Sequence, residues 1–144
     1  MLVIDTNVLV HAANVQSELH RPCRVLVESI RERTSPWYLT WGICYEFMRI
    51  CTHPRVLARP WSAAASRDFL EKILDEPSAG LLLPTEMHLS ILANIFSEIP
   101  RLSGNILHDV HTATLMREHG IKEIYTLDAD FHRFPFLTVI DPTR

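Results

Sequence analysis

The stretch LVIDTN, residues 2–7, decides the fold that we expect for this chain. Its three apolar residues, two of them β-branched, predict a short buried strand. In an open α/β sheet, ligands bind in the crevice beyond the carboxyl ends of the strands, so Asp5 is expected to face a site at that edge. The segment Asp5–Asn7 could instead serve only to cap the next helix, because these residue types are common N-caps.

Composition limits the kind of protein that this chain can form. Its 144 residues are 47% hydrophobic and 22% charged, which predicts one globular domain over residues 1–144. No apolar run approaches the roughly 20 residues of a membrane span, and no segment resembles a signal peptide, so we expect a cytoplasmic protein that does not bind membranes. The net charge of −3 argues against a generally basic nucleic-acid binder but permits an acidic metal site beside a local basic patch.

Short apolar runs alternate with segments of helical apolar spacing along the rest of the chain. We expect strands at residues 2–4, 37–39, 81–83, 123–126 and 137–140, although 81–83 could also begin a helix. We expect helices at residues 18–33, 43–52, 63–74, 85–98 and 105–119 and a loop at 11–15. Strands that alternate with helices predict an α/β fold with a parallel sheet and right-handed crossovers.

Local signals refine several of these expected elements. Thr40 and Ser62 are placed to cap the helices that follow them, and Gly120 is placed to end the helix over 105–119. In the helix over 85–98, the apolar spacing predicts that Leu89, Leu92 and Phe96 face inward. The cysteines form no C-x-x-C pair, which indicates buried reduced thiols at Cys23, Cys44 and Cys51.

Four acidic residues occupy positions where a solvated carboxylate is not expected. Asp5 and Asp128 follow strands directly, whereas Glu46 and Asp109 lie on helices among apolar residues. Gathered carboxylates repel one another and tend to protonate unless a cation neutralises them. Oxygen-only ligands suit Mg²⁺ or Mn²⁺ better than zinc. For Glu46 alone, a salt bridge to Arg49 or a position at the edge of the core is the ordinary alternative.

The same positions carry a resemblance to a known family. The segments 5–7, 108–113 and 126–131, together with Glu46, resemble the acidic motifs of PIN-domain ribonucleases. The segment 52–56 (THPRV) and the ending 134–142 resemble the VapC toxins in that group. The likeness extends in order over nearly the whole chain, and it implies a three-layer fold with strand order 3-2-1-4-5 and helices on both faces of the sheet.

The resemblance also implies roles for particular residues. The metal-binding and catalytic acids would be Asp5, Glu46, Asp109 and Asp128. Thr6, Asn7 and Thr126 would orient these acids. Asp130 could either bind the metal or cap the turn, and Asp128 is favoured as the primary acid. We therefore expect a metal-dependent endoribonuclease in which a metal-activated water attacks the phosphodiester and leaves 5′-phosphate and 3′-hydroxyl ends.

The resemblance further implies a toxin of a toxin–antitoxin pair. Its partners would be an RNA substrate, a second copy of the chain in a homodimer, and an antitoxin protein whose peptide covers the acidic groove. A basic antitoxin side chain that reaches the carboxylates is electrostatically reasonable.

Several other residues have both functional and ordinary interpretations. Arg49, Arg55 and Arg59 could bind RNA phosphates or lie on a solvated surface. The tryptophans could stack on bases or, more commonly, pack in a core or a dimer interface: Trp37, Trp41 and Trp61. The spacing of His108 and His111 permits a transition-metal site, but a polar contact or packing is the more ordinary outcome because no third histidine or cysteine lies nearby.

Two rival functions belong to other classes. An Asp-dependent phosphatase or phosphotransfer domain would use Asp5 as a nucleophile, but Thr6 and Asn7 follow it where the haloacid-dehalogenase type has a second aspartate. A catalytically silent PIN scaffold would bind RNA or protein without cutting it. The presence of all four acids weighs against the scaffold.

Overall fold

A computed structural model describes all residues, 1–144, and contains a five-stranded parallel sheet in the order β3-β2-β1-β4-β5. The strands are β1 (Leu2–Ile4), β2 (Trp37–Thr40), β3 (Ala79–Leu82), β4 (Glu123–Tyr125) and β5 (Thr138–Ile140). The expected strand order is therefore confirmed. β1 is the middle strand, and β4 is its neighbour on one side. The strand order reverses between these two strands, so their carboxyl ends flank the crevice in which such sheets bind ligands.

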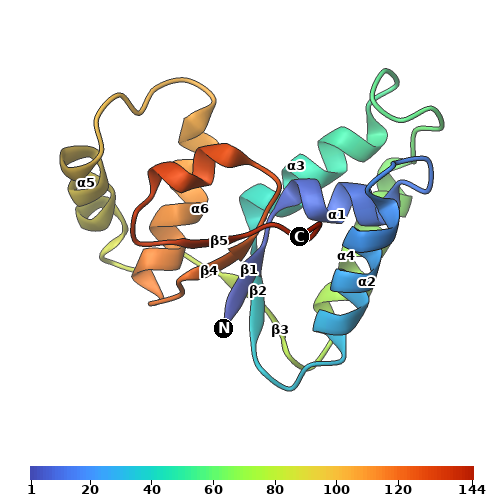
Figure 1. The fold of residues 1–144 in the computed structure, drawn as a ribbon, viewed down its shortest axis with the longest axis horizontal. Coiled ribbons are helices and arrows are strands. Elements are labelled where there is room, and N and C mark those ends of the chain that lie inside the picture. The colour runs from blue at the N-terminus through green and yellow to red at the C-terminus, as the bar shows by residue number, and fades with distance from the viewer.

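Helices cover both faces of this sheet (Figure 1). The helices are α1 (Thr6–Ala13), α2 (His20–Arg31), α3 (Trp41–Thr52), α4 (Ala63–Leu74), α5 (His88–Glu98) and α6 (Ile106–Glu118), and a 3-10 helix, η1, spans Ala129–Arg133. Helices α1 to α4 gather on one side, and α5 and α6 lie on the other (Figure 1). The three-layer architecture is thus the expected one. No helix is long and apolar enough to cross a membrane.

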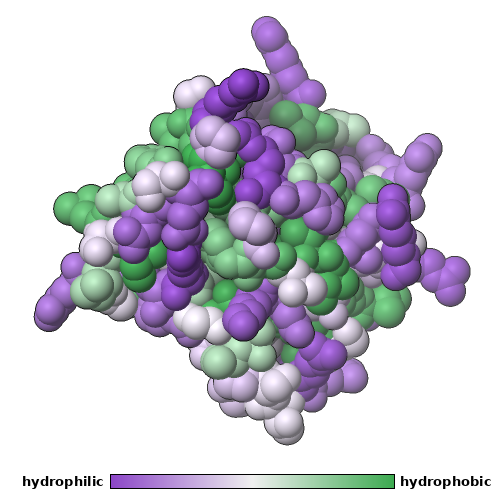
Figure 2. Space-filling model, turned by 60° about the vertical axis from the view of Figure 1, so that its left-hand side comes forward, coloured by the Kyte–Doolittle hydropathy of each residue, from purple (hydrophilic) through white to green (hydrophobic).

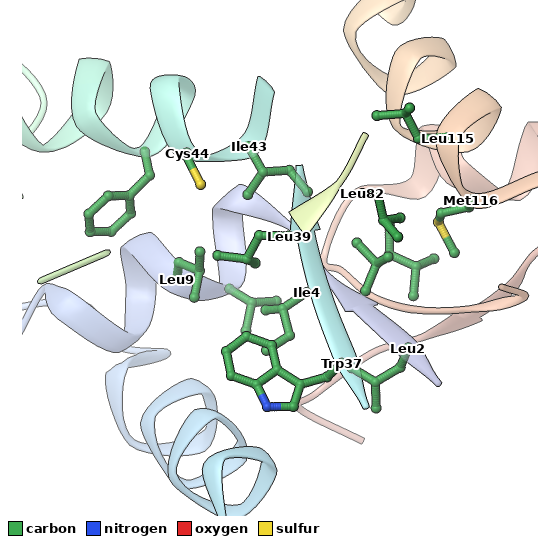
Figure 3. Close-up of a cluster of buried hydrophobic side chains, with 14 of the residues drawn as sticks. Leu2, Ile4, Leu9, Trp37, Leu39, Ile43, Cys44, Leu82, Leu115 and Met116 are labelled. Atoms are coloured by element: carbon green, nitrogen blue, oxygen red, sulfur yellow. The ribbon is translucent and has the colours of Figure 1, made fainter. Parts of the chain in front are cut away.

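The core is a single cluster of 28 buried residues centred on β1. All three residues of β1 are buried because helices cover both faces of a parallel sheet. Figure 3 shows the two halves of this packing, with Leu9 of α1 and Cys44 of α3 on one side of the strands and Leu115 and Met116 of α6 on the other. The three cysteines are buried and unpaired, as expected, and burial raises the pKa of each thiol to about 11.

Two expectations about local structure are wrong. The segment 11–15 is not all loop, because α1 continues to Ala13 and the turn begins at Asn14. Asp5 caps the N-terminus of this helix, and Val8 and Leu9 are buried in the core. The sequence carries no signal that ends the helix before Asn14. The remaining helix and strand boundaries differ from the expected ones by up to three residues, which is the usual uncertainty at element ends.

The inward face of α5 is the second error. Leu92 packs against the core as expected, but Leu89 is 77% exposed and Phe96 is 47% exposed, whereas Ile95 and Ile99 are buried. Helix α5 packs chiefly against α6, so it needs one narrow apolar stripe, which includes Leu92 and Ile95 but not Leu89 or Phe96. The face that α5 and α6 present carries apolar patches among polar side chains (Figure 2).

Gly120 ends α6 in the left-handed conformation, with φ of +67°. Residues other than Gly, Asn and Asp are strained in this backbone conformation. Gly120→Ala is expected to lower the free energy of unfolding by about 1 kcal/mol, which corresponds to about 3–4 °C in Tm. Thermal melts of Gly120→Ala beside Gly120→Asn measure this effect, and an equal Tm for Gly120→Ala and wild type would contradict it.

Candidate metal and RNA-cleavage site

An open cleft of about 1040 Å³ lies beyond the carboxyl ends of β1 and β4. All of the acids predicted from the sequence line it: Asp5, Glu46, Asp109, Asp128 and Asp130. They come from the end of β1, from α3, from α6 and from the segment after β4. The fold therefore brings together carboxylates that lie up to 125 positions apart (130 − 5) in the chain.

Asp5 is held rigidly at the end of β1. Its Oδ1 accepts a hydrogen bond from the backbone N–H of Thr6 at 2.7 Å, and its Oδ2 accepts from Asn7 Nδ2 at 2.7 Å and from Thr126 Oγ1 at 2.6 Å. The residue is only 8% exposed, and burial raises its pKa to about 6, although these hydrogen bonds partly oppose the rise. Asp5 thus caps α1 and also lines the cleft, so capping is not the only feature of its position.

Asp109, Asp128 and Asp130 form the tightest acidic group, because one carboxylate oxygen from each lies within 4.8 Å of the others. Burial raises the pKa of Asp109 to about 7, and the charges of Asp128, Asp5 and the other cleft acids add to the rise. The turn is capped by Asp128, whose Oδ1 accepts from the N–H of Asp130 at 2.8 Å. Asp130 therefore contributes its carboxylate to the acidic group and does not cap the turn.

Asn7 and Thr126 join the two strand ends into one unit. Asn7 Nδ2 also donates to Thr126 Oγ1 at 3.1 Å, and Asn7 Oδ1 accepts from the N–H of Leu127 at 3.0 Å. The hydroxyl of Thr126 accepts in turn from the N–H of Asp128 at 2.9 Å. This chain of hydrogen bonds fixes the backbone that carries Asp128 relative to Asp5. The Thr6 hydroxyl points elsewhere, 3.5 Å from the Ile43 carbonyl oxygen.

Glu46 lies at the rim of the cleft and is not buried among apolar residues. Its side chain is 41% exposed, and Oε1 lies 3.4 Å from Nη2 of Arg49. The ordinary alternative, an ion pair at the edge of the core, thus describes its position. Its charge nevertheless raises the pKa of Asp5 and Asp109, because it lies in the same cleft.

The predicted basic residues separate in the structure. Arg49 lines the cleft, whereas Arg55 and Arg59 are exposed on the connection between α3 and α4 and do not line it. His111 packs against the His88 ring, with centroids 6.0 Å apart, so packing describes it better than metal binding does.

The sequence interpretation missed several residues that line the cleft, among them His11 and Tyr45. Helical spacing could have indicated both. His11 lies four residues after Asn7 on α1, and Tyr45 lies four residues before Arg49 on α3.

Comparison with known proteins identifies the family. A family model described as the PIN domain matches residues 2–137. This chain belongs to the PIN-domain family. The PIN domain is 30% identical over 139 residues to Ribonuclease VapC48 of Mycobacterium tuberculosis, which covers 96% of this chain and 94% of the relative. It is 31% identical to Ribonuclease VapC37 of the same organism, and the match covers 93% of this chain and 92% of the relative. It is therefore a PIN domain of the VapC type.

Solved structures support the fold of this PIN domain. The crystal structure of VapBC2 from Rickettsia felis bound to a promoter DNA fragment has a TM-score of 0.68 at 13% identity and covers 96% of both chains. The structure of Mycobacterium tuberculosis VapC20, a Sarcin-Ricin loop cleaving toxin, has a TM-score of 0.64 at 14% identity, with 92% and 93% covered. Identities this low support the architecture alone.

Proposed function

We propose that this PIN domain is a metal-dependent endoribonuclease and the toxin of a toxin–antitoxin pair. The observation that carries the proposal is the convergence of Asp5, Glu46, Asp109 and Asp128 on one cleft, joined there by Asp130. The relatives named as VapC ribonucleases, which are about 30% identical over nearly the whole chain, support RNA cleavage.

The donor set suits a hard divalent cation. Every candidate ligand in the acidic group is a carboxylate oxygen, which favours Mg²⁺ or Mn²⁺ over zinc. Burial, with an additional contribution from the neighbouring carboxylates, raises the pKa of Asp5 and Asp109, so a bound cation would stabilise their charged forms. Asp5, Asp109, Asp128 and Asp130 would hold the ion, and Glu46 would act from the rim. A bound ion acidifies a water molecule and stabilises the departing oxygen of the phosphodiester.

The remaining side chains of the cleft position these acids and the substrate. Asn7 and Thr126 keep both oxygens of Asp5 and the backbone of Asp128 fixed through the hydrogen bonds described above. Arg49 offers a guanidinium at the rim, where a phosphate of the RNA strand would otherwise meet only negative charge. Neither a histidine nor a lysine base is needed.

A direct cleavage assay tests the proposed activity. The purified protein is incubated with a labelled single-stranded RNA and Mg²⁺, Mn²⁺ or EDTA, and the products are mapped. We expect internal cuts with 5′-phosphate and 3′-hydroxyl ends that require the metal. Equal cleavage in EDTA would overturn the metal mechanism. A phosphorylated Asp5 trapped with a phosphate ester would instead favour the phosphatase rival, and metal binding without any cleavage would favour the silent scaffold.

The proposed partners follow from the acidic cleft and the family. We propose a cytoplasmic homodimer that an antitoxin inhibits by placing a basic side chain among the cleft carboxylates. Production of the protein alone is expected to stop bacterial growth, and co-production of the small protein encoded beside it is expected to restore growth. Growth arrest by an Asp109→Asn variant as strong as that by wild type would argue against this role.

Asn7 gives a separate test of how the acids are positioned. Asn7→Ala removes the amide that donates to Asp5 and Thr126 and accepts from Leu127. We expect RNA cleavage to fall by about 10- to 100-fold, the usual effect of losing a group that orients a metal ligand. Initial rates at several Mg²⁺ concentrations measure this loss. Asn14→Ala at the end of α1, outside the cleft, is the matched control, and an equal loss in both variants would contradict the positioning role.

A further inference from the structure

Two exposed aromatic side chains form a pair on the outer face of α3. Trp41 is 50% exposed and Tyr45 is 68% exposed. They are four residues apart on the helix, and their rings meet edge to face, with centroids 6.4 Å apart and planes at 64°. Two large aromatic side chains that contact each other and still expose half or more of their surface leave ring faces for another molecule to contact.

The other tryptophans have structural roles that Trp41 lacks. Trp37 is fully buried in β2, and its indole N–H donates to Ser78 Oγ at 3.1 Å. Trp61 packs on Phe47 and Phe69, with ring centroids at 6.1 and 5.5 Å. Core packing therefore accounts for Trp37 and Trp61. It does not account for Trp41, whose aromatic neighbour, Tyr45, is more exposed than Trp41 itself.

The pair is continuous with the acidic cleft. Tyr45 and Gly42 line the cleft, and Trp41 adjoins both. The next turn of the same helix carries Glu46 and Arg49, which also line it. Tyr45 and Arg49 share one helix face because they are four residues apart. A nucleotide at this rim would thus meet an aromatic ring and a guanidinium side by side.

Charge favours an aromatic contact for an RNA that enters this cleft. The cleft holds five carboxylates against the single guanidinium of Arg49, so phosphate contacts alone provide little attraction. Stacking of a base on an aromatic ring does not require positive charge in the cleft. It is available to every base, because each base has a π-face. Bases within a duplex already stack on their neighbours, so only an unpaired base can use such a ring.

We propose that Trp41 and Tyr45 form a base-stacking platform that holds an unpaired base of a single-stranded RNA beside the acidic cleft, with Arg49 on a neighbouring phosphate. The platform rests on the proposed ribonuclease function and extends it, because it assigns to Trp41 and Tyr45 the binding of a base next to the cleft. Both residues act as substrate-positioning groups, so their loss should raise KM and leave kcat nearly unchanged.

Binding to an uncut oligonucleotide tests the platform apart from catalysis. An Asp128→Asn background keeps a dye-labelled single-stranded RNA oligonucleotide intact, and the fluorescence anisotropy of the dye reports its binding, so the signal is retained when the exposed Trp41 is replaced. We expect Trp41→Leu and Tyr45→Leu each to weaken binding by about tenfold, the ratio typical for the loss of one stacked base. Trp41→Phe and Tyr45→Phe should retain most of the affinity, since they keep a ring. Phe96→Leu, an exposed aromatic on α5 outside the cleft, is the matched control.

The outcomes separate the platform from its alternatives. Unchanged affinity in both leucine variants would overturn the platform. A shift from dimer to monomer in Trp41→Leu, measured by light scattering, with unchanged RNA affinity would assign the pair to a contact between two copies of the chain. Failure of the wild-type protein to cleave RNA would reject the proposed function, whereas the fluorescence assay would still report whether the platform binds unpaired bases.

Discussion

Replacement of Asp109 by asparagine is expected to lower the rate of metal-dependent RNA cleavage by about a thousandfold, equivalent to about 4 kcal/mol of lost transition-state stabilisation. Asp109 belongs to the tightest acidic group of the cleft, and its pKa of about 7 is the highest that the cleft imposes on a carboxyl. Asparagine keeps the size of the side chain but removes the negative charge that would hold the ion. Initial rates at saturating Mg²⁺ and Mn²⁺ measure the loss.

Asp68→Asn is the matched control for this variant. Asp68 is exposed on α4, where it pairs with Arg67 at 3.2 Å, and it does not line the cleft. The cleavage rate of Asp68→Asn should equal that of wild type. Calorimetric titration with Mn²⁺ provides a second measurement, in which Asp109→Ala should lose the binding that wild type has. A cleavage rate for Asp109→Asn within tenfold of wild type would show that the acidic group does not hold the ion needed for cleavage.

Ionisation of Asp5 and Asp109 is expected to destabilise the metal-free protein as the pH rises from about 4 to 8. The folded state raises the pKa of Asp5 to about 6 and that of Asp109 to about 7, from 3.8 for an ordinary aspartate. Between these values the folded chain retains protons that the unfolded chain has released, so unfolding releases protons and higher pH favours the unfolded state. The shift of Asp5 alone, about two pH units, corresponds to about 3 kcal/mol, or about 10 °C in Tm.

A divalent cation should reverse this loss, because it neutralises the carboxylates whose ionisation destabilises the fold. Thermal melts at pH 5 and pH 8, with EDTA and with Mg²⁺, measure both effects. We expect the Tm in EDTA to be lower at pH 8 and the Mg²⁺-bound protein to lose little between the two values. Asp109→Asn should melt higher than wild type at pH 8 in EDTA. An Asp109→Asn variant that melts at the same temperature as wild type at pH 8 in EDTA would contradict the destabilisation by the buried, gathered carboxylates.

Local interactions made several features predictable from the sequence. Thr40 and Ser62 cap α3 and α4, with their hydroxyls accepting from the N–H groups of Ile43 and Ala65, and Gly120 ends α6. Each of these signals acts within a few residues, so no knowledge of the rest of the fold is needed to recognise it. The faces of α5 were not predictable in this way, because the sequence has two apolar stripes there and only the position of α6 decides which one is buried.

The sequence by itself determined that an apolar strand ends in Asp5, that helices and strands alternate in a parallel sheet, and that acids recur where apolar residues surround them. Only the tertiary structure decided which acids meet. It joins Asp130 to Asp109 and Asp128, leaves Glu46 paired with Arg49 at the rim, and exposes Trp41. The physical reason is that repulsion, burial and hydrogen bonding between side chains depend on distances of a few ångströms, which only the packing of helices on the sheet sets for residues far apart in the chain.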